Sequence, residues 1–227
     1  ELLKIDISDP TQPRVAESLD LPGRPRRIAL AGDNVFITTQ KAGLLVARFS
    51  SDQPGRLIGS LMRPWPMSDF SQALGIEVRG SYAYVILDAE GLQVVDISQP
   101  EKPKEAIFFP LPARGLSIGL SEDFAVVSTK WNGYFFIDIS RPERPQLAAN
   151  IYLPRGSSEF KLEENRLYAA SQSFGINVIP LPLKNIGASR FSDHALTFEK
   201  PQFPGWYDLS VGGGKKLVTV ASALKVD

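Results

Sequence analysis

The stretch Gly91-Leu-Gln-Val-Val-Asp-Ile-Ser-Gln-Pro-Glu-Lys-Pro103 decides the fold of this chain, because it returns as Gly133-Tyr-Phe-Phe-Ile-Asp-Ile-Ser-Arg-Pro-Glu-Arg-Pro145. The same phrase opens the chain as Glu1-Leu-Leu-Lys-Ile-Asp-Ile-Ser-Asp-Pro-Thr-Gln-Pro13, and weaker copies begin at Gly43 and Gly175. A period of roughly 40–45 residues is typical of β-propellers and similar repeat arrays. The repeat therefore predicts the fold class, whereas it leaves the function open.

One repeat contains four predicted strands. Residues 91–98 alternate and are rich in β-branched side chains, which indicates a strand, and the prolines that follow cannot continue it. Further strands are expected at residues 104–109, 116–120 and 124–129. We equate one such sequence unit with one four-stranded antiparallel propeller blade. The predicted fold class is all-β: a β-propeller-like array of about four to five blades, with a small β appendage or a closing blade.

The packing between blades is predicted from the alternation of the inner strands. Their inward faces are expected to be buried against the neighbouring blade, so that stability is shared along the array. The apolar positions on these faces are Ile28, Leu30, Val35, Ile37, Ile76, Val78, Ala83 and Val85.

The phrase Leu-x-Val-Ile/Val-Asp-Ile-Ser-x-Pro-x-x-Pro, followed by a strand such as Tyr82-Ala-Tyr-Val85, resembles the LVIVD-repeat family over residues 1 to about 182. The resemblance implies β-propeller blades and a surface or secreted protein, so the expected location is extracellular or at the cell surface. It carries over no catalytic residues, because the family shares none. The chain departs from the pattern at Ala47-Arg48-Phe49, where Asp-Ile is expected, and at Pro180.

The last residues, 183–227, lose the phrase and form a second predicted domain beside the repeats at 1–182. The segment Pro204-Gly-Trp-Tyr-Asp-Leu-Ser-Val211, ahead of a Gly-rich hairpin, resembles the second half of an IPT/TIG-type immunoglobulin-like domain. The alternative is a fifth propeller blade closed by the N-terminal strands, since Phe203-Pro-Gly205 matches Leu21-Pro-Gly23. A complete immunoglobulin sandwich needs about 100 residues, which is more than this segment offers.

Composition excludes several classes of function. The 25 basic and 25 acidic residues balance and are scattered, so no nucleic acid partner is expected. No apolar run approaches about 18 residues, so membrane insertion is not expected. With no cysteine and a single histidine, the chain has no thiolate or histidine-cluster metal site, and no cofactor or metal is predicted. No signal peptide is visible, and residue 1 lies inside a copy of the phrase, so we expect further sequence ahead of it.

An aspartate and a serine two residues later recur in the three strong copies of the phrase. Asp6, Asp96 and Asp138 suggest calcium ligands, but each loop offers only one or two carboxylates, whereas a calcium site needs several. We therefore interpret each aspartate as a side-chain cap of the turn that the prolines force.

Arginine recurs at the connection between successive blades, where an outer strand leads to the next inner strand. In a propeller this connection lies on one face, together with the loops that join the second and third strands. Guanidinium groups bind carboxylate or sulfate through a bidentate fork, and exposed aromatic rings stack on sugars. The candidate ligand-binding residues are Arg24, Arg63, Arg114, Arg155, Trp65, Trp131 and Phe174.

These features favour a non-enzymatic binding or adhesion module of a larger surface or secreted protein. Its partner on the arginine-bearing face is expected to be an anionic glycan or a protein. An architectural repeat scaffold is the first alternative, and a propeller-fold lyase or hydrolase is the second, since this fold hosts many functions. No catalytic residue is predicted, because His194 lies in the strand-like tail and the chain offers no Ser-x-Gly elbow to go with it. The sequence predicts no oligomeric state.

Overall fold

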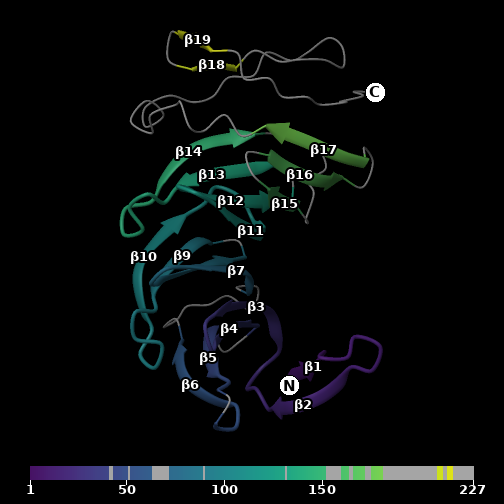
Figure 1. The fold of residues 1–227 in the computed structure, drawn as a ribbon. Helices are drawn as coiled ribbons and strands as arrows, with labels where there is room; N and C mark the ends of the chain where they lie inside the picture. Colours follow the sequence, from purple (N-terminus) through teal and green to yellow (C-terminus); the bar gives the residue numbers. More distant parts are fainter. Residues whose placement is uncertain are drawn as a thin grey trace. The chain divides into compact units, whose positions relative to one another are not determined.

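The computed structural model describes residues 1–40, 43–50, 52–62, 72–88, 90–130, 132–151, 160–163, 166–171, 175–180, 209–211 and 214–216. These residues form strands and turns, with no helix among them (Figure 1). The chain divides into two compact units, Glu1–Pro110 and Leu111–Asp227, which are described separately.

Unit 1 contains a two-stranded hairpin and two four-stranded sheets, all antiparallel. In each sheet the strands follow one another in chain order, so that each sheet is a meander. The hairpin joins β1 (Leu2–Asp6) and β2 (Arg14–Leu19). The first sheet is formed by β3 (Pro25–Ala31), β4 (Asn34–Thr39), β5 (Gly43–Arg48) and β6 (Arg56–Leu61). The second is formed by β7 (Ala73–Arg79), β8 (Tyr82–Leu87), β9 (Gly91–Asp96) and β10 (Lys104–Pro110).

Unit 2 repeats the same plan. Its four-stranded sheet is formed by β11 (Gly115–Ser121), β12 (Phe124–Thr129), β13 (Tyr134–Asp138) and β14 (Gln146–Ile151). A three-stranded sheet follows, with β15 (Phe160–Glu163), β16 (Arg166–Ser171) and β17 (Gly175–Pro180). A short hairpin joins β18 (Leu209–Val211) and β19 (Gly214–Lys216).

The sequence unit and the sheet are offset by two strands. The four strands predicted between residues 91 and 129 are present as β9 to β12, but β9 and β10 belong to one sheet and β11 and β12 to the next. Four strands per repeat are confirmed, but one sequence unit is not one sheet, because the sheet boundary falls inside the unit, at the connection where the arginines were expected. The repeated phrase supplies the third strand of a sheet, because the turn after it leads to the fourth strand and not to a new sheet.

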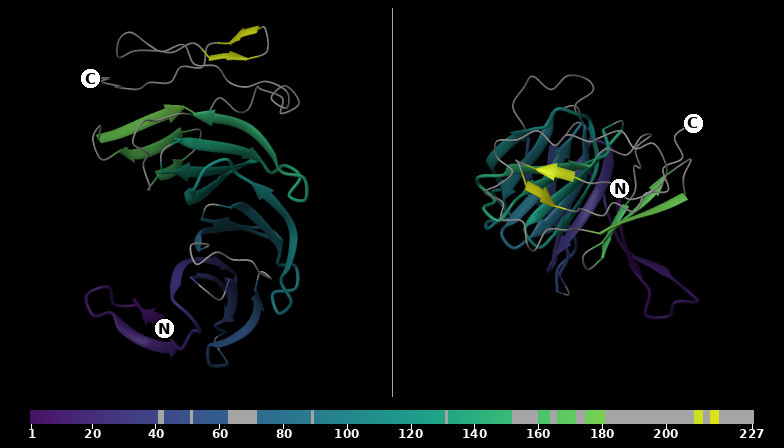
Figure 2. Two further views of the ribbon diagram at one scale, coloured as in Figure 1. Left: turned by 180° about the vertical axis from the view of Figure 1, so that it is seen from behind. Right: turned by 90° about the horizontal axis from the view of Figure 1, so that it is seen from above.

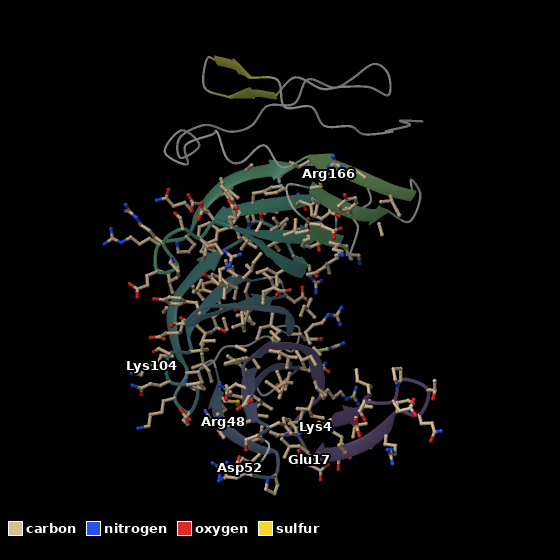
Figure 3. All side chains as sticks on the ribbon, in the orientation of Figure 1. Lys4, Glu17, Arg48, Asp52, Lys104 and Arg166 are labelled. Carbon is tan, nitrogen blue, oxygen red and sulfur yellow. The ribbon has the colours of Figure 1, made fainter. Side chains whose placement is uncertain are left out.

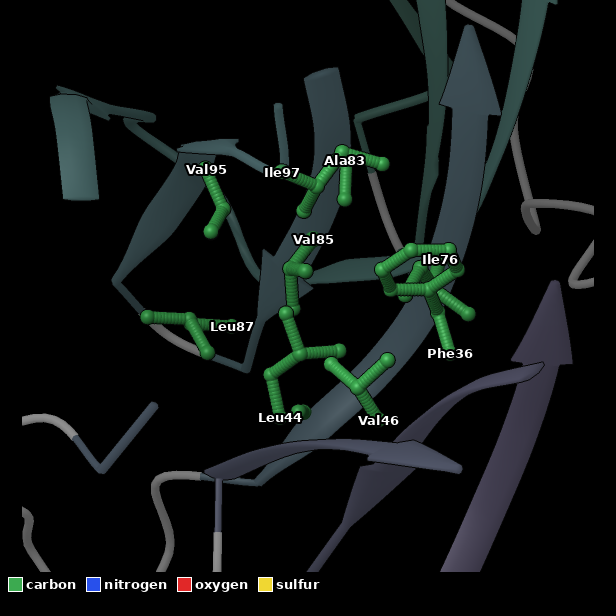
Figure 4. Close-up of a cluster of buried hydrophobic side chains, with 10 residues drawn as sticks. Phe36, Leu44, Val46, Ile76, Ala83, Val85, Leu87, Val95 and Ile97 are labelled. Atoms are coloured by element: carbon green, nitrogen blue, oxygen red, sulfur yellow. The ribbon is translucent and has the colours of Figure 1, made fainter. Parts of the chain in front are cut away.

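The core of unit 1 lies between its two sheets. Phe36, Leu44 and Val46 of the first sheet pack against Ile76 and Val85 of the second (Figure 4). Each of these side chains is at most 5% exposed. Because alternate residues of a strand point to opposite faces, the other face of the first sheet is free to carry a second apolar cluster.

That second cluster contains Val35, Ile37, Leu45 and Ala47, against which Leu2, Leu19 and Leu21 of the N-terminal hairpin region pack. The Lys4 ammonium also lies over the Phe49 ring, 5.9 Å from its centroid. Figure 2 shows the hairpin and the sheet of this unit from two further directions.

The burial predicted for this face is wrong at Ile28 and Leu30, which are 53% and 68% exposed. Residues of the hairpin region pack against the cluster that contains Val35 and Ile37 of β4. They do not bury Ile28 and Leu30 on the neighbouring strand β3.

The core of unit 2 joins its two larger sheets. Phe136 and Val126 of the β11–β14 sheet pack with Leu167 and Ile179 of the three-stranded sheet. The Tyr134 and Phe160 rings meet edge to face, with centroids 5.5 Å apart. Unit 2 is therefore stabilised by the same sheet-on-sheet burial as unit 1.

Candidate functional site

The loop before the first strand of a sheet and the loop between its second and third strands lie at the same end, because the strands are antiparallel. We call this the first-strand end. In the β3–β6 sheet the Gln40 backbone N–H donates to the Arg24 carbonyl (2.9 Å), and in the β7–β10 sheet Asp88 N–H donates to the Gln72 carbonyl (2.8 Å). These bonds tie the two loops together, so the residue before the first strand has a fixed backbone.

Two of the seven candidate residues lie in the described part of the chain. Arg24 stands directly before β3 in unit 1, and Arg114 stands directly before β11 in unit 2. Both side chains are exposed, and both occupy the same position at the first-strand end of their sheets. Arg63, Trp65, Trp131, Arg155 and Phe174 lie outside the described residues.

The structure adds a polar contact that the sequence reasoning missed. The Arg26 guanidinium donates to the Gln72 side-chain oxygen, which joins the first sheet to the residue directly before β7. Gln72 thus holds the position that Arg24 and Arg114 hold in the other sheets.

Arg26 is also a β-bulge residue, since Pro25 pairs with Thr39 while Arg27 pairs with Thr38. The first strands of the next two sheets have their bulges at Leu74 and Leu116. A bulge re-aims a side chain and increases local twist. The first sheet therefore presents a charged group where the others present leucine.

Arg48, which replaces the expected aspartate of the phrase, joins the two sheets of unit 1 at the opposite end. Its Nε donates to Asn34 Oδ1 (2.9 Å), and its terminal nitrogen pairs with Glu101 Oε1 at 2.8 Å. The pKa of Glu101 is lowered by its own backbone N–H and by the Arg48 guanidinium. Figure 3 labels Arg48 on β5. This departure from the phrase is therefore accompanied by a contact between neighbouring sheets.

The three repeated aspartates cap turns, as the sequence predicted. Asp6, Asp96 and Asp138 accept the backbone N–H of the serine two residues on, at 2.9, 2.8 and 2.8 Å. These N–H donors lower the pKa of Asp6 and Asp96. Within the described ranges, no group of three or more His, Asp or Glu side chains is placed to hold a metal ion.

In each unit, the first-strand end of one sheet carries an arginine, whose guanidinium group is of a type that can bind carboxylate or sulfate. Arg24 and Arg114 present exposed guanidinium groups, each with five N–H donors in a planar fork. Arg26 presents a third group, held by Gln72. Among the described residues, no helix is long and apolar enough to cross a bilayer.

The comparison with protein families matches the LVIVD repeat at residues 1–20, 72–108 and 115–152. The matched stretches contain the three strong copies of the phrase, and they support the resemblance to the LVIVD repeat family. No curated protein matches the chain.

Solved structures with similar folds are distant in sequence. The computationally designed Ika4 protein has a TM-score of 0.58 at 12% identity, covering 74% of this chain and 98% of its own. AztD from Citrobacter koseri has a TM-score of 0.53 at 14% identity, covering 70% of this chain and 44% of AztD. BamB from Moraxella catarrhalis has a TM-score of 0.52 at 14% identity, covering 82% of this chain and 54% of BamB. This chain thus spans about half the length of AztD and BamB.

Together with the sheets, these likenesses confirm the predicted fold class, an all-β, propeller-like array of four-stranded antiparallel sheets. At such low identity they establish the fold alone. A propeller-like repeat fold supports a binding or scaffold module in general terms.

Proposed function

We propose that this chain is a non-enzymatic binding module of a surface or secreted protein, which recognises an anionic glycan at the first-strand end of its sheets. The observation that carries the proposal is the shared position of Arg24 and Arg114, both exposed and both directly before a first strand. A guanidinium group binds a carboxylate or a sulfate through a planar bidentate fork, and the hydrogen bond from Gln40 fixes the backbone from which the Arg24 side chain extends.

The test is binding to neutral, carboxylated and sulfated glycans at low and high salt, with two double variants that remove equal charge. Arg24→Ala/Arg114→Ala removes the two arginines at the first-strand end. Arg14→Ala/Arg144→Ala is the control, because exposed Arg14 begins β2 of the hairpin and exposed Arg144 lies in the turn between β13 and β14, so neither precedes a first strand. Loss of salt-sensitive binding in the first variant alone would support the proposal. Equal loss in both would reduce it to a net-charge effect, and no binding by the wild type would favour the architectural scaffold.

A protein ligand with an acidic surface is the second candidate for the same end of the sheets, since arginine forks bind peptide carboxylates equally well. The enzyme alternative is a lyase or hydrolase, and its glycoside hydrolase form requires two carboxylates about 5–10 Å apart. Turnover of any glycan that binds would favour this alternative over the binding module.

For residues 183–227 we propose an immunoglobulin-like segment, with part of a further blade as the alternative. One observation favours the alternative: Val211 pairs with Gly214 across a two-residue connection, as Ala31 pairs with Asn34 and Arg79 with Tyr82. Expression of residues 183–227 alone tests the choice. A cooperative thermal transition would support the immunoglobulin-like segment, whereas an unfolded product would favour the blade.

A further inference from the structure

An open strand edge and an uncovered apolar stripe lie beside each other in unit 1. Among the described strands, β1 is hydrogen-bonded only to β2, so its other edge is unpaired. Leu2 of β1 packs against the cluster that contains Val35 and Ile37, which are the cross-strand partners of Leu30 and Ile28. We call the unpaired edge of β1, together with exposed Ile28 and Leu30, the open surface.

The second sheet of the unit provides a matched example of the same face in its covered state. Ile76 occupies the register position of Ile28, two residues after the bulge of its first strand. Ile76 is 5% exposed, whereas Ile28 is 53% exposed. The cover over Ile76 includes Phe36 of β4 and Leu44 of β5. On the Ile28 side, β1 corresponds to β5, because both carry a copy of the phrase. None of the described strands corresponds there to β4.

The phrase itself shows the same difference. In β9 it is paired on both edges, with β8 and β10, and residues 91–95 are buried. In β1 it is paired on one edge, and residues 3–6 are exposed. An unpaired strand edge next to apolar side chains is a template for addition of another strand.

We propose that the open surface docks an extended strand of a partner protein, paired antiparallel with β1. The orientation follows from the three complete sheets, where the third strand is always antiparallel to the second. The docked strand continues an existing interface, because the hairpin already covers Val35 and Ile37 and the strand extends this cover to Ile28 and Leu30.

The chemistry of the docked strand follows from β4, which occupies the equivalent place beside β5. Its side chains alternate, and Phe36 is the large apolar residue that contacts the cluster around Ile76. The partner is therefore a strand of about six residues with a large apolar or aromatic side chain at alternate positions on one face. Main-chain hydrogen bonds to β1 give affinity, and the apolar contacts select the sequence.

A labelled synthetic peptide with the sequence of residues 33–40, Asp-Asn-Val-Phe-Ile-Thr-Thr-Gln, is the probe, and a scrambled peptide is its control. Fluorescence anisotropy measures binding to the full chain. The test variant is Ile28→Ser/Leu30→Ser, and the matched control is Met62→Ser/Leu147→Ser, which also removes two exposed apolar side chains. Saturable binding to the wild type and the control, weakened at least about tenfold in the test variant, is the expected result.

Two results would overturn the proposal. The first is absence of saturable binding to the folded wild type, or equal binding to the test variant, because either shows that the surface takes no added strand. The second comes from light scattering of the protein alone. A dimer that dissociates in Ile28→Ser/Leu30→Ser would show that a second copy, and not a partner strand, occupies the surface.

Discussion

The hairpin β1–β2 and the pair β9–β10 are built from the same phrase, yet one is largely exposed and the other is buried. Ile7 and Ile97 make the comparison at a single position, since both follow Asp in the phrase and are 68% and 5% exposed, respectively. The local turn is the same in both, with Asp6 and Asp96 capping the following serine. The comparison teaches that the phrase determines the strand and its turn, whereas the neighbouring sheet determines burial.

The largest expected effect is on the buried member of the isoleucine pair. Ile97→Ala removes apolar atoms from the cluster between the two sheets of unit 1, and should lower the free energy of unfolding by about 2–5 kcal/mol. Ile7→Ala should change it by less than about 0.5 kcal/mol, because the side chain is mostly in water. Urea unfolding of both variants measures the difference. Equal losses would show that the hairpin is covered as fully as the sheet.

Gly59 of β6 gives the next effect. A Cβ at this position would collide with the Pro100 carbonyl oxygen, which lies in the turn after β9. The hairpin has Glu17 at the corresponding place in β2, so the close approach is specific to the pair of sheets. Gly59→Ala should therefore destabilise unit 1 by about 1–3 kcal/mol, as overpacking does. Thermal unfolding measures it, with exposed Ser60→Ala as the control. Unchanged stability in Gly59→Ala would mean that the turn moves away without cost.

Glu77 of β7 should give a smaller effect that depends on pH. Burial raises the pKa of Glu77 above its ordinary value, and the nearby Arg79 opposes this only in part. The folded state thus binds the proton more tightly than the unfolded state, so stability is full below the unfolded pKa and is lost as pH rises through the folded one. Glu77→Gln should be more stable than the wild type at pH 7, and the gain should vanish near pH 4. The melting temperature across pH measures it, and a gain independent of pH would contradict it.

The smallest effect is expected at the caps, and here the two copies of the phrase should behave alike. Backbone N–H donors lower the pKa of Asp6 and Asp96, so the stabilisation is present above the unfolded pKa and is lost as pH falls through the folded one. Asp96→Ala and Asp6→Ala should each flatten the acid limb of the stability profile slightly. Calorimetry between pH 2 and pH 6 measures this. An effect in Asp96→Ala alone would show that the turn of the hairpin differs from that of the sheet.

Strand positions could be predicted well because they depend on local alternation and on prolines. Residues 91–98, for example, predicted β9, and the Asp–Ser turn was identified from its spacing alone. The blade boundary could not be predicted from the period, since a repeat of four strands has the same period wherever it is cut. The burial of Ile28 and Leu30 was predicted from the alternation of apolar residues along the strand. Alternation shows which face of a strand is apolar, but it does not show whether a neighbouring element covers that face.

The candidate site was predictable in part. The positions of Arg24 and Arg114 follow from the phrase, because each precedes a first strand by one residue. The contact of Arg26 with Gln72 joins residues of neighbouring sheets, and no local pattern reports such a contact. Likewise, the Arg48–Glu101 pair is visible in the sequence only as a departure from the phrase.

Amide hydrogen exchange of the protein alone tests the central claim, that neighbouring strands and not the phrase determine burial and pairing. Exchange of β1 should be faster than that of β9 by several orders of magnitude, because among the described strands β1 is paired on one edge and β9 on both. Equal protection of β1 and β9 would contradict the account, since it would show that the edge of β1 is already covered.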